Sequence, residues 1–185
     1  QMCIRDSRMI QLVNDILQLS HLDNVSETGA APAMETVDLL DVARECVERQ
    51  KVNARHSYIS LTYLGESAPV TGSRVLLDEL CQNLCDNAIR YNRPGGKVQI
   101  ITACTRDGHC TLTVKDNGIG IPKEAQTSVF ERFYRVDKSR SKATGGTGLG
   151  LAIVKHIARI HNARIKLDSV VDEGTTITVI FETAS

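Results

Sequence analysis

The sequence predicts an α/β protein in which helices lie on one face of a mixed, mostly antiparallel sheet. Segments with apolar residues at helical spacing tend to alternate with pairs of short strands. Two of these strand pairs turn over short polar segments, Asp107-Gly108 and Glu173-Gly174. A composition that is 42% apolar and 24% charged is that of an ordinary globular domain. When helices pack on one face of a sheet, the apolar faces of the helices and of the sheet are both buried.

Length and charge limit the classes to which this chain can belong. Its 185 residues suit one good-sized domain with a small appendage. Lys plus Arg and Asp plus Glu both total 22, which argues against broad electrostatic binding of nucleic acid. A local cationic site for a phosphate ligand stays open. No apolar run is long enough to span a bilayer, and no signal peptide is visible.

The first part of the chain predicts one helix and a linker. Residues 1–7 show no pattern and are left out of the fold prediction. A helix is predicted over residues 8–22. Its apolar residues make a wide stripe: Met9, Ile10, Leu12, Val13, Ile16, Leu17 and Leu19. Such a stripe needs a partner helix in a bundle, so residues 1–24 are predicted to form one helix of a hairpin. Residues 25–36 are predicted to be a linker, and residues 37–185 the main domain.

The main domain is predicted to contain three longer helices and five strands. The helices are expected at residues 38–55, 73–91 and 149–161. The strands are expected at residues 58–64, 98–104, 110–115, 164–169 and 175–181. Ser73 is expected to cap the second of these helices.

The six cysteines are interpreted as small buried hydrophobic residues in a reducing compartment. None forms a CxxC pair, and no histidine stands at zinc-finger spacing. A metal site or a disulfide is the alternative, because Cys81 and Cys85 can share a helix face and Cys104 and Cys110 can face each other across a hairpin. The remaining two are Cys3 and Cys46.

A polar stripe follows the second predicted helix of the main domain. Its members stand four, four and three residues apart: Glu79, Asn83, Asn87 and Arg90. Asparagine is unfavourable in the interior of a helix, so two asparagines one turn apart indicate that they bind a ligand. Asparagine oxygens suit Mg²⁺, which takes hard oxygen ligands. A solvated helix face is the alternative interpretation.

A glycine-containing turn follows the strand at 110–115. Strand alternation places Leu112, Val114 and Asp116 on one face, so Asp116 is expected to point inward at the strand end. A buried carboxylate needs a donor, and the amino group of adenine is a suitable one. Gly118 and Gly120 allow a tight turn against a flat base. The alternative is an ordinary strand-ending turn.

A second glycine-rich segment, residues 145–150, precedes an apolar helix. Its backbone N–H groups and the helix N-terminus can meet phosphate. The Gly-Lys-Ser/Thr of a P-loop is absent, and a polar run rather than a strand precedes the glycines, so a dinucleotide fold is also excluded. The cations in or beside that run fit a lid over a polyphosphate: Arg135, Lys138, Arg140 and Lys142. A disordered surface loop is the alternative.

Taken together, the motifs resemble those of sensor histidine kinases. Residues 83–88 look like the N box of that family, 116–120 like its first glycine box, 130–135 like its F box and 146–151 like its second glycine box. The helix at the N-terminal end is similar to the second helix of the family's dimerisation and phosphotransfer domain. The chain departs from the pattern in one respect. The phospho-accepting histidine belongs on the preceding helix, and none of the five histidines here, His21 included, has its sequence context.

The resemblance implies the two-layer α/β sandwich of the Bergerat, or GHKL, ATPases and the binding of Mg²⁺ and ATP. It implies that Asn83 and Asn87 hold the metal and that Arg135 and Arg140 neutralise phosphate charge. Glu79 stands where ATPase relatives keep a water-activating carboxylate, which makes it a candidate base. The other implied nucleotide-binding residues are Arg90, Tyr91, Asp116, Gly118, Gly120, Ile121, Phe130, Lys138, Gly146, Thr147, Gly148, Leu149, Gly150 and Leu151.

The resemblance also implies the reaction and the partners. The expected activity is transfer of the γ-phosphoryl group of ATP to a histidine that this sequence lacks, for relay to an aspartate of a response regulator. The expected partners are the histidine-bearing helix of the same kinase and the receiver domain, in a homodimeric parent. The expected location is cytoplasmic, in a parent anchored to the membrane by upstream segments. Two alternatives stay open, namely a binding or dimerising module without kinase activity and a serine kinase of the anti-sigma type.

Overall fold

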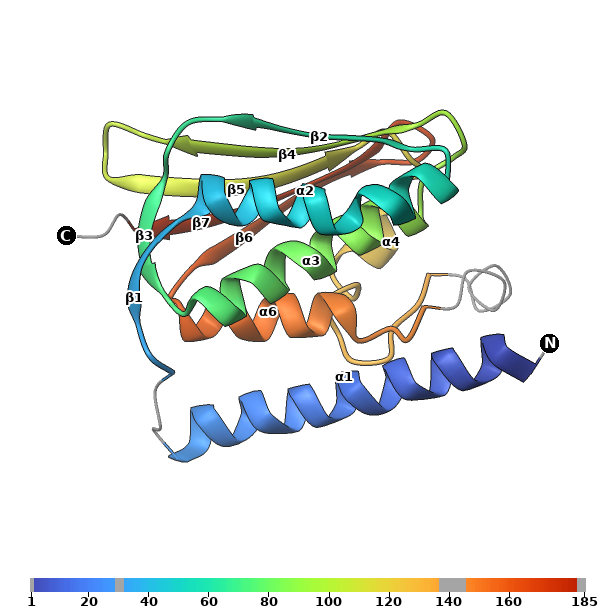
Figure 1. The fold of residues 1–185 in the computed structure, drawn as a ribbon, viewed down its shortest axis with the longest axis horizontal. Helices are drawn as coiled ribbons and strands as arrows, with labels where there is room; N and C mark the ends of the chain where they lie inside the picture. Colours follow the sequence, from blue (N-terminus) through green and yellow to red (C-terminus); the bar gives the residue numbers. More distant parts are fainter. Residues whose placement is uncertain (1, 29–31, 137–145, 183–185) are drawn as a thin grey trace.

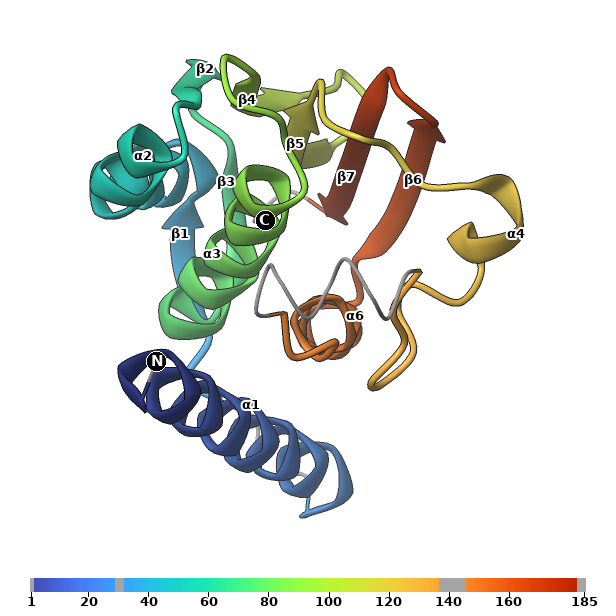
Figure 2. The ribbon, with the colours of Figure 1, turned by 90° about the vertical axis from the view of Figure 1, so that its right-hand side faces the viewer.

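The computed structural model describes residues 2–28, 32–136 and 146–182. One sheet is covered on one face by three helices, α2 (Leu39–His56), α3 (Arg74–Arg90) and α6 (Gly150–Ile160). A long helix, α1 (Met2–Thr28), lies on the side of this helical layer away from the sheet and packs on α6 (Figures 1 and 2). The predicted layering of helices on one sheet face is confirmed.

The sheet has five strands in the order β2-β4-β5-β7-β6. Their bounds are β2 Ser60–Gly65, β4 Lys97–Cys104, β5 His109–Asp116, β6 Arg164–Val170 and β7 Gly174–Glu182. Strand β2 pairs with β4 in parallel, and the other neighbours are antiparallel. The sheet is therefore mixed, and the end of β5 that carries Asp116 lies beside Thr175 at the start of β7.

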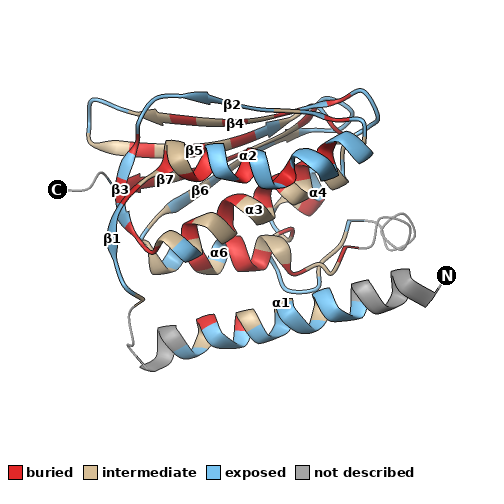
Figure 3. Ribbon diagram, in the orientation of Figure 1, coloured by how far each residue is buried: buried red, intermediate tan, exposed pale blue. Residues whose placement is uncertain are grey.

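The core lies between the sheet and the three covering helices, as the buried segments in Figure 3 show. Leu112 and Val114 of β5 point into it, as the alternation predicted. The helices present apolar stripes at helical spacing toward the same layer. Those of α3 and α6 are Leu77, Leu80, Cys81, Leu84, Cys85, Ala88, Ile89, Ala152, Ile153, Val154, Ile157 and Ala158.

Two short strands escaped prediction. Strand β1 (Glu35–Asp38) pairs with β3 (Pro69–Gly72), and α1 continues to Thr28, so the predicted linker at 25–36 was too long. Asp38 ends β1 and caps α2, because its carboxylate accepts from the N–H of Leu40 at 2.9 Å and of Ala68 at 2.8 Å. A short helix, α4 (Lys123–Gln126), also escaped prediction.

The start of α3 differs from the prediction in its capping. Ser73 holds the capping position, but its hydroxyl makes no capping hydrogen bond. Its backbone N–H instead donates to Nε2 of His161, at 3.0 Å. The Nδ1 atom of His161 donates to the carbonyl oxygen of Ile157, at 2.8 Å, so the ring links the end of α6 to the start of α3. Burial lowers the pKa of His161.

Helix α1 is longer than the predicted residues 8–22 and includes most of the segment that showed no pattern. Leu19 and Leu22 are buried against the main domain, whereas Met9, Val13 and Leu17 face solvent. Most of the predicted apolar stripe is therefore open in this chain (Figure 3). Within the described part of the chain, no helix is long and apolar enough to cross a bilayer.

The five cysteines whose side chains the structure describes divide into two groups, and Cys3 lies outside them. Cys46, Cys81 and Cys85 are free and buried where α2 meets α3, as expected. Cys104 and Cys110 are register partners of β4 and β5 and form a disulfide, which was the alternative interpretation. The described residues contain no His, Cys, Asp and Glu cluster suited to a metal ion.

Candidate functional site

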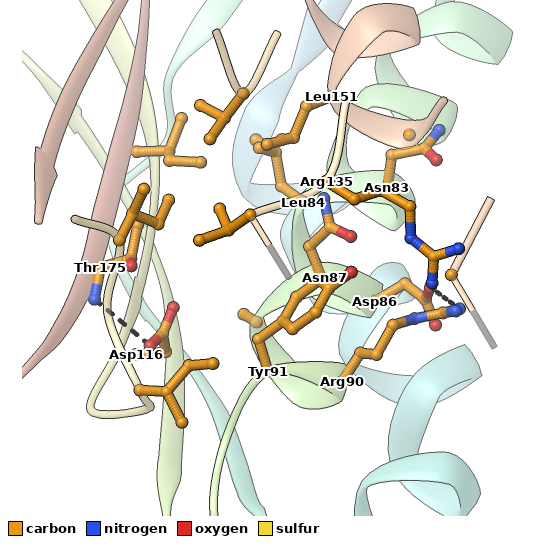
Figure 4. Close-up of a pocket in the computed structure, with 18 of the residues that line it drawn as sticks. Asn83, Leu84, Asp86, Asn87, Arg90, Tyr91, Asp116, Arg135, Leu151 and Thr175 are labelled. Atoms are coloured by element: carbon orange, nitrogen blue, oxygen red, sulfur yellow. Dashed lines mark hydrogen bonds and ion pairs between the residues drawn. The ribbon is translucent and has the colours of Figure 1, made fainter. Parts of the chain in front are cut away.

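A cavity of about 690 Å³ opens between α3, the ends of β5 and β7, and the segment before α6. Figure 4 shows Asp116 and Thr175 on its sheet side and Asn83, Arg90 and Arg135 on the opposite side. Most of the predicted site residues line it: Asn83, Asn87, Arg90, Tyr91, Asp116, Gly120, Ile121, Arg135, Gly146, Thr147, Gly148, Gly150 and Leu151.

Asp116 places a buried carboxyl group at the sheet end of the cavity. Its Oδ1 atom accepts from the N–H of Gly118 at 2.8 Å and of Thr175 at 3.3 Å. Burial raises the pKa of Asp116, and these two hydrogen bonds oppose the rise. Among the described residues none is seen donating to Oδ2, so this oxygen is available to an amino group of a ligand.

The first glycine segment packs directly on the end of α3. A Cβ atom at Gly118 would stand 2.4 Å from the carbonyl oxygen of Tyr91, which leaves room only for glycine. The N–H of Ile119 donates to that same carbonyl oxygen, at 3.1 Å. Gly118 does not itself line the cavity, but its N–H and its close approach fix Asp116 and Tyr91 relative to each other.

The polar stripe of α3 supplies the amide and cationic side chains. The Nδ2 atom of Asn83 donates to the carbonyl oxygen of Glu79 at 3.0 Å, which turns Oδ1 toward Gly150 at the start of α6. Asn87 follows one turn later and lines the same wall. Arg90 pairs with Asp86 at 2.7 Å. This wall combines hard oxygen donors with a held cation, as a metal–phosphate ligand requires.

The second glycine segment forms the end of the cavity opposite Asp116. A Cβ atom at Gly146 would lie 3.0 Å from the hydroxyl oxygen of Tyr91, so the backbone passes close to the ring. Gly148 adopts a positive φ of 77°, which favours glycine. The first turn of α6 begins at Gly150, so its free N–H groups face the same end.

Helix α1 also reaches the cavity, which the sequence did not predict. Gln11 and Asp15 are part of its lining. The hydroxyl of Thr147 donates to Oδ2 of Asp15 at 2.7 Å. Further along α1, Arg132 donates to both carboxylate oxygens of Asp23, at 2.7 and 2.8 Å. Asp15 and Thr147 are 132 residues apart in the chain, and no local pattern in the sequence predicts their contact.

Three predicted site residues besides Gly118 lie outside the lining. Leu149 is buried in the core, and Phe130 is half-buried. Glu79, the candidate base, interacts with α1 rather than with the cavity. Burial raises the pKa of Glu79 to about 7, the Asp15 carboxylate adds to the rise, and a hydrogen bond from Gln18 opposes it. Its position therefore does not support a role in activating a group bound in the cavity.

Three of the predicted lid cations, Lys138, Arg140 and Lys142, lie outside the described residues, as does most of the expected lid at 137–147. Several lining residues were not predicted. Val114 and Ile177 form part of the apolar wall, and strand alternation alone could have pointed to both. The other unpredicted apolar members are Leu84, Ala88, Ile119, Val129, Val136 and Val171.

The chain is similar to known proteins in both sequence and structure. A family model described as histidine kinase-, DNA gyrase B- and HSP90-like ATPase matches residues 72–185. The sensor-like histidine kinase SenX3 of Mycolicibacterium smegmatis is 44% identical over 97% of this chain and 46% of its own length. The sensor protein kinase WalK of Staphylococcus saprophyticus is 39% identical over 92% of this chain and 28% of its own length. The chain thus spans less than half the length of these relatives.

Solved structures show the same fold. The mycobacterial sensor histidine kinase MprB is 32% identical, with a TM-score of 0.70 over 81% of this chain and 97% of that chain. Full-length ShkA in complex with AMPPNP gives a TM-score of 0.78 over 96% of this chain and 36% of that chain. At 24% identity, the second likeness is one of fold alone.

Proposed function

The chain belongs to the family of histidine kinase-, DNA gyrase B- and HSP90-like ATPases as a histidine kinase catalytic domain, and we propose on that premise that it binds Mg·ATP for phosphoryl transfer to a histidine. One observation carries the proposal. A single cavity has a buried carboxyl group, Asp116, at one end and, at the other, the N–H groups of a glycine segment that lies beside Arg90 and Arg135. That polarity matches a ligand with an amino-bearing base and a polyphosphate.

The described side chains have different roles in binding such a ligand. Asp116 receives the amino group of adenine, while Tyr91 lies beside the base. Asn83, with Asn87 beside it, would hold Mg²⁺, which would neutralise charge on the phosphates. Arg90 and Arg135 line the opposite wall and supply further positive charge. Phosphoryl transfer depends mainly on positioning and charge neutralisation, which these groups supply. We propose the same role for Lys138 and Arg140 on sequence grounds.

The acceptor and the partners belong to the proposal as well. The acceptor is a histidine on a helical domain of the same kinase, and the product passes its phosphoryl group to a response regulator. We assign residues 1–24 to the second helix of that domain and the ATP-binding unit to residues 37–185. The open apolar face of α1, which includes Met9 and Val13, is suited to the bundle of a homodimer. We place the reaction in the cytoplasm, where ATP is available, in a parent anchored to the membrane.

Transfer to a supplied acceptor tests the function. The chain is incubated with labelled Mg·ATP, alone and with a helical hairpin that carries a histidine kinase acceptor motif. We expect base-stable, acid-labile label on the hairpin and none on the chain, because none of its five histidines has the acceptor context. Transfer is expected to be slow, since separate molecules lack the effective concentration that tethering provides. ATP binding without transfer at any hairpin concentration would support the binding-only alternative.

A further inference from the structure

One face of α1 is docked on the catalytic domain. Asp15, Gln18, Leu19 and Leu22 stand three, one and three residues apart and therefore share a helix face, called here the docked face. Leu19 and Leu22 are buried against the main domain, and Gln18 lies beside Glu79 of α3, where it opposes the rise in the pKa of that carboxyl group. Asp15 is the member of the docked face that enters the nucleotide cavity.

Asp15 occupies the hydrogen-bond donor of the Thr147 side chain, which belongs to the second glycine segment. The hydroxyl of Thr147 has one hydrogen, and that hydrogen is directed to Oδ2 of Asp15 at 2.7 Å. The same hydroxyl oxygen accepts from the N–H of Leu149, at 3.3 Å. While this pair persists, Thr147 cannot donate to an oxygen of a bound phosphate.

Asp15 also places a carboxyl group at the end of the cavity where the negatively charged phosphates of the nucleotide would lie. Burial raises the pKa of Asp15, the Thr147 hydrogen bond and the Arg90 cation oppose the rise, and the Asp86 carboxylate adds to it. Arg90 is already paired with Asp86 at 2.7 Å. Asp15 and Asp86 therefore both act on Arg90 at this end of the cavity, which Arg135 also lines. A negatively charged phosphate entering between them would be repelled by Asp15.

We propose that Asp15 competes with the terminal phosphates of the nucleotide for this end of the cavity, so that docking of α1 and binding of ATP oppose each other. The inference rests on the proposed binding of ATP and concerns how that binding is regulated. Because linkage is reciprocal, docked α1 weakens ATP binding by the same factor by which ATP weakens docking. The antagonism grows with the number of phosphates, so it is absent for adenosine, intermediate for ADP and greatest for ATP.

Titration calorimetry on the full chain with adenosine, Mg·ADP and Mg·ATP tests this. Asp15→Ala removes the competitor, and Leu22→Ala weakens docking seven residues away without changing any charge. We expect both variants to bind ATP more tightly, Asp15→Ala by roughly 5- to 150-fold, the range usual for coupled sites. Adenosine should bind all variants alike. Glu48→Ala, which removes an exposed carboxylate on α2, is the charge-matched control and should change nothing.

The outcomes separate the two proposals. ATP that binds the unchanged chain and Asp15→Ala with equal affinity would overturn the competition and leave the proposed function standing. Tighter binding by Asp15→Ala but not by Leu22→Ala would also overturn it, since local charge alone would then explain the effect. Absence of ATP binding in every variant would remove both the proposed function and this inference.

Hydrogen exchange gives a second readout that does not depend on variants. Helix α1 draws stability from its docked face, so release should speed exchange of its amides at residues 15–22. We expect this acceleration with Mg·ATP and not with adenosine. Exchange that stays the same or slows when ATP is bound would contradict release of the helix.

Discussion

Replacing Asp116 by asparagine tests the adenine end of the cavity without disturbing its shape. The asparagine Oδ1 can still accept from the N–H groups of Gly118 and Thr175, which now hold the carboxylate at 2.8 and 3.3 Å. The other oxygen, which faces the ligand, becomes an NH₂ donor. Opposite the amino group of adenine, that change replaces an ionised acceptor by a second donor.

The size of the effect follows from the kind of hydrogen bond that is lost. A hydrogen bond to a charged group contributes about 1.5–3 kcal/mol. With every 1.4 kcal/mol corresponding to about tenfold in affinity, Asp116→Asn should weaken ATP and ADP by about 10- to 100-fold.

The same substitution should not weaken the fold. Burial raises the pKa of Asp116, so the folded chain favours the neutral form more than the unfolded chain does. The ionised carboxylate therefore costs stability at neutral pH, and this cost disappears as the pH falls through the raised pKa. A neutral asparagine removes the cost. We expect the melting temperature of Asp116→Asn without nucleotide to be equal to or higher than that of the unchanged chain.

Calorimetry for affinity and a thermal melt for stability test both expectations. Asp107→Asn makes the same change in charge at an exposed turn near the far end of β5 and should alter neither measurement. Unchanged affinity of Asp116→Asn for ADP would remove Asp116 from base recognition. Weaker binding together with a lower melting temperature would show that the substitution acts through the fold, and the reasoning would then be wrong.

Three further predictions concern the metal, the pH dependence and the disulfide. Asn83→Ala should reduce ATP affinity in the presence of Mg²⁺ more than in its absence, and equal losses in the two titrations would argue against a metal ligand. Because burial lowers the pKa of His161 from 6.5, the unfolded chain binds protons more readily below that pH. Urea titrations should therefore show a free energy of unfolding that falls as the pH drops below about 6.5, and His161→Gln should flatten this dependence. Reduction of the disulfide between Cys104 and Cys110 should lower stability by up to about 2 kcal/mol, because it closes a short loop, and should leave ADP affinity unchanged.

Much of the catalytic domain could be predicted because its information is local. Alternation in β5 placed Leu112, Val114 and Asp116 on the inner face, and the structure bears this out. Helical spacing likewise placed Asn83 and Asn87 on one wall of the cavity.

The remaining features depend on contacts between distant segments. Strands β1 and β3 are four residues each and form through pairing with each other, so neither shows a pattern of its own. At the start of α3, the N–H of Ser73 donates to His161, 88 residues away, and the expected capping bond of the Ser73 hydroxyl is absent. The approach of Asp15 to Thr147 depends on how α1 packs on α6, which no periodicity reports.

The position of β7 has a consequence for how the chain folds as it is synthesised. This strand is last in the sequence, yet it stands between β5 and β6 and pairs with residues 109–116 of β5 along their whole length. Until it emerges, β5 presents an unpaired inner edge and β6 has no described neighbour in the sheet. The middle of the sheet must therefore form late, through contacts of long sequence separation, which slows folding and prolongs exposure of apolar strands. Ribosome-bound chains that stop before residue 174 should consequently bind chaperones and resist compaction, whereas chains with β7 outside the exit tunnel should fold.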